Sequence, residues 1–134
     1  MKNIVSSHKI DSKKIFGFDP GWPVMGFDSV PDGLAEYVPV ADNSYCFDVA
    51  TTRAILAGFT HNRRVLIQGF HGTGKSTHIE QVAARLNYPC VRINLDSHIS
   101  RVDLLGKDAI ILQDGKQITT FQEGMLPWAY QRPV

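Results

Sequence analysis

The chain has 134 residues, enough for one folded core and too few for a second full domain. Its 14 Lys and Arg residues against 13 Asp and Glu give a net charge of +1, which leaves no electrostatic case for nucleic acid or an anionic membrane as the main partner. Residues 1–14 carry no secretory signal, and no run approaches the ~20 apolar residues of a spanning helix. We therefore expect a cytoplasmic protein.

Residues 1–45 are predicted to form a leader that differs from the rest of the chain. Prolines and glycines are dense here, which breaks helices and favours turns and short extended pieces. These residues are Gly17, Pro20, Gly21, Pro23, Gly26, Pro31, Gly33 and Pro39. The apolar side chains of Ile15–Phe18, Trp22 and Phe27 can dock on a partner subunit. The alternative is a poorly ordered leader with a few anchoring aromatic residues.

The middle of the chain alternates between predicted helices and strands. A helix should begin after Asp48, whose carboxylate can cap the first turn, and end near His61. The apolar run Val65–Ile67 is typical of a buried parallel strand. A glycine-rich loop follows, then a helix from Lys75 to Leu86. Cys90–Asn94 is predicted as a second strand.

The C-terminal part is predicted to contain a short helix, a hairpin and a further helix. Asp114-Gly115 between two apolar runs is a strong signal for a β-hairpin. The predicted bounds are a cap at Ser97–Ser100, a helix ended by Gly106, strands over Ala109–Leu112 and Gln117–Phe121, and a helix within Gly124–Tyr130.

The two cysteines, Cys46 and Cys90, have neither a CxxC spacing nor the spacing of metal ligands. We expect two buried apolar thiols in a reducing compartment, with a single disulfide as the alternative.

Gly69–Ser76 fits the phosphate-loop pattern GxxxxGK[ST] at every fixed position. Glycines let the backbone approach phosphates, and the N–H groups of the loop and of the following helix can bind phosphate oxygens. Lys75 would stabilise the β- and γ-phosphates, and the Ser76 hydroxyl would bind Mg²⁺. The sequence thus predicts ATP, with GTP as the alternative, and Mg²⁺ as cofactors. The predicted binding residues are Gly69, His71, Gly72, Thr73, Gly74, Lys75, Ser76 and Thr77.

Two histidines flank this motif. His71 is expected at the tip of the loop, and His78 is expected on the surface of the following helix. Either can be interpreted as a catalytic base, but we predict that role for neither.

From Asp48 to Tyr130 the chain resembles AAA+ ATPases that carry a β-hairpin in the helix after the second strand. Besides the phosphate loop, the resemblance lies in Arg92–Asp96, Ser100–Gly106 and Glu123–Pro127. It implies an α/β fold of the P-loop NTPase αβα type, incomplete, with the hairpin inserted after strand two and a loop-rich leader. The implied domains are a leader over 1–45 and a partial nucleotide-binding domain over 46–134.

Within that class the chain is similar to the small ATPase subunit of aerobic cobaltochelatase. The similar stretches are Thr52–Arg64, Gly72–Asp108 and Leu126–Gln131, together with a leader element at Phe16–Asp19. The resemblance implies that Gly69–Thr77 bind ATP with Mg²⁺ at Ser76, and that Phe47 and Asp48 lie beside the adenine.

The resemblance also implies partners and a reaction. The family forms a hexameric ring of identical copies, docked to a subunit with a von Willebrand-type metal-binding domain. ATP hydrolysis then drives a large chelatase subunit to insert cobalt into the corrin ring of hydrogenobyrinic acid a,c-diamide, in cobalamin biosynthesis.

The sequence lacks the acidic Walker B pair that catalysis in this class requires, and Asp96, Asp103 and Asp108 are not expected to replace it. The sheet order of the class would also separate the two predicted strands, leaving ladder groups unpaired at about 1–3 kcal/mol each. We therefore expect the N-terminal portion of a longer subunit, which binds ATP without hydrolysing it and has no catalytic residue of its own.

Two other functions stay open. A small P-loop kinase has the same loop, but Arg101 and Asp103 are the only candidates for its substrate site and a basic lid is missing. The second is a non-catalytic module that binds nucleotide or a partner.

Overall fold

The computed structural model describes residues 7–30 and 33–134, so the turn expected at Pro31 lies outside the described residues. Its contacts form two compact units, Met1–Cys90 and Val91–Val134. The predicted domains, 1–45 and 46–134, stay a prediction, and the contacts divide the chain at a different place. In the described residues, no helix is both long enough and apolar enough to cross a membrane.

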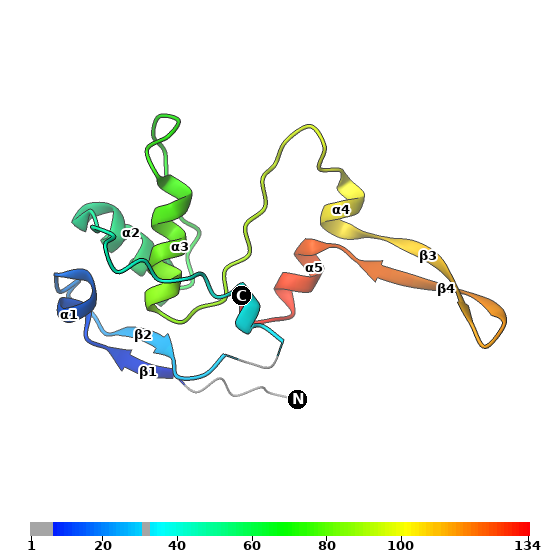
Figure 1. The fold of residues 1–134 in the computed structure, drawn as a ribbon, viewed down its shortest axis with the longest axis horizontal. Helices are drawn as coiled ribbons and strands as arrows, with labels where there is room; N and C mark the ends of the chain where they lie inside the picture. Colours follow the sequence, from blue (N-terminus) through cyan, green and yellow to red (C-terminus); the bar gives the residue numbers. More distant parts are fainter. Residues whose placement is uncertain (1–6, 31–32) are drawn as a thin grey trace. The chain divides into compact units, whose positions relative to one another are not determined.

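The leader forms a small sheet with one short helix (Figure 1). Strand β1 (Ser7–Ile10) pairs antiparallel with β2 (Val24–Phe27), with Ile10 opposite Val24. Between them, α1 (Ser12–Phe16) ends at Gly17, whose φ of 82° is the left-handed cap conformation. A 3₁₀ turn, η1, spans Ala35–Tyr37. The expectation that this composition breaks every helix was wrong, because residues 12–16 contain neither proline nor glycine.

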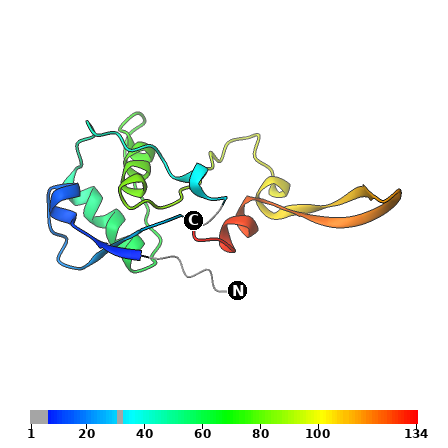
Figure 2. The same cartoon turned by 60° about the horizontal axis from the view of Figure 1, so that its bottom comes forward.

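Two longer helices follow the leader. In α2 (Val49–Thr60), the Asp48 carboxylate accepts a hydrogen bond from the Thr51 N–H at 2.8 Å, which confirms the predicted cap. Asn62, with φ of 48°, ends the segment in the left-handed conformation. The helix α3 (Lys75–Arg85) has the predicted start and ends one residue earlier. The two helices lie against each other in both views (Figures 1 and 2).

The core of the first unit joins the leader to α2 and α3. Phe16 and Val24 from the leader are buried with side chains of both helices, and Ile15 and Phe18 pack on that cluster. The buried cluster comprises Ile10, Phe16, Val24, Ile55, Leu56, Val82 and Leu86. The leader's apolar side chains therefore dock on this chain's own helices.

The second unit contains the predicted hairpin between two short helices. Ser100 and Asp103 form a capping box at the start of α4 (Arg101–Leu105). Strands β3 (Gly106–Gln113) and β4 (Lys116–Glu123) pair antiparallel around a turn in which Asp114 and Gly115 have φ of 51° and 75°. Positive φ at both turn residues is what a type I′ hairpin requires. The helix α5 is Met125–Tyr130, so all three predictions are confirmed, with strands longer than predicted.

Neither Val65–Ile67 nor Cys90–Asn94 forms a strand, which corrects two predictions. Among the described residues the strands form two separate two-stranded antiparallel sheets, β1 with β2 and β3 with β4. A strand needs a neighbouring strand to pair its backbone groups, and within the described part of the chain neither segment has one, although the Cys90 N–H donates to the Tyr37 carbonyl. Val65 is accordingly 42% exposed and Leu66 92%.

Both cysteines are free thiols, but only one is partly buried. Cys46 is exposed and Cys90 is half-buried, so the expectation of two buried thiols was wrong for Cys46.

Candidate functional site

The glycine-rich motif forms a loop that ends at the start of α3. Gly72 and Gly74 have φ of 78° and 76°, in the region that side-chain-bearing residues avoid. Gly74 is the N-cap of α3 and supplies no side-chain hydrogen bond to it. The amides of the first helical turn, which have no intrahelical acceptor, are therefore open at the positive end of an 11-residue helix.

Lys75 folds back over this loop. Its Nζ donates to the Phe70 carbonyl oxygen at 2.5 Å, and Thr73 Oγ1 donates to the same oxygen at 2.9 Å. A Cβ on Gly69 would lie 3.3 Å from Thr73 Oγ1, tighter than most real contacts. The Lys75 ammonium therefore lies against the backbone of the loop that precedes α3.

The remaining polar residues of the motif have side chains that are open to solvent. His71, Ser76 and Thr77 are exposed, with Ser76 in the first helical turn. Open amides and an ammonium suit phosphate oxygens, and a hydroxyl beside them suits a hard cation such as Mg²⁺. The residues present therefore fit a magnesium–phosphate group.

His78 is buried, contrary to the prediction that it lies on the helix surface. Only 7% of it is exposed, and its Nε2 lies 2.7 Å from Thr52 Oγ1 on α2. The reason is the packing of α3 on α2, which turns this face of α3 inward. Burial lowers the pKa of His78, an effect that the nearby Asp48 carboxylate partly offsets.

Aromatic side chains surround His78. The rings of Tyr45 and Phe47 pack edge-on against the imidazole, with distances between ring centroids of 5.6 and 5.8 Å. The centroids of the Tyr45 and Phe47 rings are 5.0 Å apart. The Arg85 guanidinium lies 5.8 Å from the Phe47 ring. Sequence reasoning missed Thr52 and Tyr45, since no local pattern indicates that positions 26 residues apart meet at a hydrogen bond.

The acidic residues considered as catalytic substitutes lie in the second unit. Asp103 accepts the Ser100 hydroxyl at 2.7 Å as part of the capping box, and these hydrogen bonds hold the pKa of its carboxyl below the usual range. Asp96 accepts the His98 N–H at 2.8 Å. Asp108 lies on β3. The hydrogen bonds described for Asp96 and Asp103 are local, as those of capping and turn residues are.

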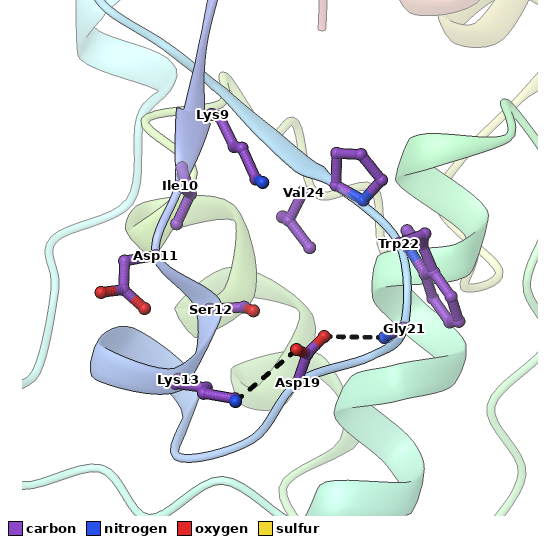
Figure 3. Close-up of a pocket in the computed structure, with 10 residues that line it drawn as sticks. Lys9, Ile10, Asp11, Ser12, Lys13, Asp19, Gly21, Trp22 and Val24 are labelled. Atoms are coloured by element: carbon purple, nitrogen blue, oxygen red, sulfur yellow. Dashed lines mark hydrogen bonds and ion pairs between the residues drawn. The ribbon is translucent and has the colours of Figure 1, made fainter.

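A cavity of about 590 Å³ lies beside β1 and α1 (Figure 3). Its wall contains Lys9 and Lys13 as well as Asp11 and Asp19. Lys13 Nζ lies 3.8 Å from Asp19, which also accepts the Gly21 N–H at 2.9 Å. The charges of the wall balance and none of its residues belongs to the phosphate-type loop, so we assign it no part in nucleotide binding.

Fold and loop together define an α/β chain with a glycine-rich loop of the phosphate-binding type at a helix N-terminus. The chain is 61% identical over 125 residues, 93% of its length, to the aerobic cobaltochelatase subunit CobS of Sinorhizobium sp.. The match covers 36% of that relative, so the chain spans about a third of its length. No protein-family model matches the chain, and no solved structure matches it.

Proposed function

We propose that this chain is the nucleotide-binding portion of the AAA+ ATPase subunit of an aerobic cobaltochelatase. The observation that carries the proposal is the 61% identity to the cobaltochelatase subunit. A match over 93% of the chain necessarily takes in the central residues Gly69–Thr77. The loop geometry supports the nucleotide part of the proposal independently, through the open amides of α3 and the position of Lys75.

In this proposal each part of the loop has one role. The first-turn amides of α3 hold phosphate oxygens, and the Lys75 ammonium moves from the Phe70 carbonyl to the β- and γ-phosphates. The Ser76 hydroxyl holds Mg²⁺, which supplies charge neutralisation of the phosphates when bound. His71 and Thr77 complete the rim of the site. Phe47 and Asp48 lie on the base side of the nucleotide.

The word subunit in the relative's name supports a complex of several subunits, and the resemblance described above supplies the proposed ring and partners. Further copies of the chain would form a ring, which would work with a von Willebrand-type metal-binding subunit and a large chelatase subunit. ATP hydrolysis by that assembly would drive the insertion of cobalt, the substrate metal, into the corrin ring of hydrogenobyrinic acid a,c-diamide. The chain alone binds ATP without turnover, because no acidic pair that orients the attacking water occurs in its sequence.

Titration calorimetry with Mg·ATP on the 134-residue chain tests this function. Lys75→Ala removes a charge-assisted contact to phosphate, so we expect the dissociation constant to rise about 10- to 100-fold. Lys116→Ala, an exposed lysine next to the hairpin turn, is the matched control and should bind as the wild type does.

Hydrolysis is followed in parallel as phosphate release. We expect no release above background from the chain alone. Steady turnover that Lys75→Ala abolishes would contradict the binding-only role, and unchanged binding by Lys75→Ala would contradict the site.

A further inference from the structure

His78 joins the beginnings of two helices through two hydrogen bonds in series. Its Nε2 lies 2.7 Å from Thr52 Oγ1, and that oxygen lies 2.6 Å from the Asp48 carbonyl oxygen. A carbonyl only accepts, so the single hydroxyl proton goes to Asp48, and the His78 Nε2–H donates to Thr52. This relay connects the first turn of α3, next to the phosphate-type loop, to the residue that caps α2.

The relay is buried and therefore costly to break. Thr52 is fully buried and His78 is 7% exposed. A buried donor or acceptor that loses its partner keeps its desolvation penalty, which water cannot relieve. Tyr45 and Phe47 also pack edge-on against the imidazole. The position of segment 45–48 relative to the loop therefore depends on His78, together with the Arg85 guanidinium over the Phe47 ring.

We propose that His78 is a positioning residue that fixes segment 45–48 against the phosphate loop, so that recognition of the nucleoside part of a nucleotide depends on the His78–Thr52 hydrogen bond while recognition of its phosphates does not. The inference rests on the proposed function. The loop's own donors are backbone amides and the Lys75 ammonium, which folds onto the Phe70 carbonyl. The imidazole instead packs on α2 and the aromatic rings, so the two sets of contacts use different groups.

The test compares Mg·ATP with Mg·tripolyphosphate, which has the same phosphate chain and no nucleoside. Wild type should bind Mg·ATP more tightly than Mg·tripolyphosphate in titration calorimetry. His78→Phe keeps an aromatic ring of similar size but loses the donor. We expect it to weaken Mg·ATP binding about tenfold, the net value of one hydrogen bond, and to leave tripolyphosphate binding within about twofold. His78→Gln, whose Nε2 can donate from a matching position, should restore most of the loss.

A second pair of variants breaks the same hydrogen bond from α2. Thr52→Val has nearly the shape of threonine without the hydroxyl, and Thr52→Ser keeps the hydroxyl. We expect Thr52→Val to reproduce the selective loss of Mg·ATP affinity and Thr52→Ser to spare it. His78→Phe and Thr52→Val combined should cost no more than Thr52→Val alone, because Thr52→Val already removes the hydrogen bond to His78 along with the one to the Asp48 carbonyl.

Any other outcome contradicts either this inference or the proposed function. Equal losses for both ligands would show general damage to the loop and overturn the inference, as would no loss for either. Equal wild-type affinity for the two ligands would overturn the inference and leave the proposed phosphate site standing. No wild-type binding of either ligand would overturn the proposed function itself. Circular dichroism checks folding, and if His78→Phe does not fold, the Thr52 pair decides.

Discussion

Cys90 contacts the leader through its backbone and has a partly buried thiol. Its backbone N–H donates to the Tyr37 carbonyl at 2.9 Å, which holds the end of the first unit against η1. Burial, and to a lesser degree the Glu80 carboxylate, raises the pKa of the Cys90 thiol. Cys46, which directly follows the leader, is exposed.

Alkylation should therefore distinguish the two thiols. The thiolate is the reactive form, and a raised pKa keeps Cys90 protonated at a pH where an ordinary thiol is partly ionised. At pH 8 we expect iodoacetamide to modify Cys46 about tenfold faster than Cys90, with the difference shrinking as pH rises. Mass spectrometry of the two peptides measures the rates, and the same reaction in urea is the control. Equal rates in the folded chain would contradict the packing of Cys90.

At the scale of elements, α2 contains a glycine that the fold requires. Gly58 is buried, and a Cβ built there would collide with the Val65 side chain and lie 3.2 Å from the Arg63 carbonyl. Val65, in a segment that was predicted as a strand and is not one, thus packs closely on α2 at Gly58.

This packing reverses the usual effect of removing a helical glycine. Gly58→Ala would gain about 1 kcal/mol from helix propensity at an open position. Here we expect a net loss of about 1–3 kcal/mol in the free energy of unfolding, because Val65 must move. Val65→Ala removes the obstacle, so the double variant should regain stability relative to Gly58→Ala. Urea unfolding followed by circular dichroism measures both, and a stabilised Gly58→Ala would refute the contact.

Elements defined by local chemistry were the ones that the sequence could predict. Asp48 and Ser100 cap helices, and Asp114-Gly115 closes a hairpin, because each acts on residues within a few positions of itself. The same holds for the phosphate-type loop, whose glycines and Lys75 are adjacent in sequence.

Features that depend on distant residues were not predictable in this way. Val65–Ile67 has the composition of a buried strand, but a strand also needs a partner, which composition does not specify. His78 occupies an ordinary helical position, and only the packing of α2 makes it an inward one. The pairing of Ile10 with Val24 was hidden for a related reason, since the prolines and glycines between them obscured two very short strands.

On the scale of the whole molecule, the two units differ in how they are stabilised. In the described residues every buried hydrophobic side chain of the core lies in the first unit. They are Ile10, Phe16, Val24, Leu34, Ile55, Leu56, Val82, Ala83 and Leu86. The described residues of the second unit have the hairpin ladder and the capping box of α4, but no comparable core. Burial of apolar area is the main favourable term in folding.

The two tryptophans allow each unit to be followed separately, since Trp22 lies in the first and Trp128 in the second. In Trp22→Phe and Trp128→Phe variants, fluorescence reports one unit at a time. We expect the Trp128 signal to change at a lower urea concentration and with a smaller m-value, because less surface is exposed on unfolding. Coincident transitions would show that the units unfold as one.

The β3–β4 hairpin has a consequence for how the chain behaves in concentrated solution. The pairing places Ile111 directly opposite Ile118, while Ile110 and Leu112 alternate to the opposite face, where they are 71% and 74% exposed. A hairpin with one apolar face can bury that face against a single partner, but this hairpin exposes apolar side chains on both faces. When the hairpins of two molecules stack, each buries one apolar face and leaves the other exposed to a third molecule. We therefore expect any self-association through this element to grow into open-ended stacks, which do not close at a pair.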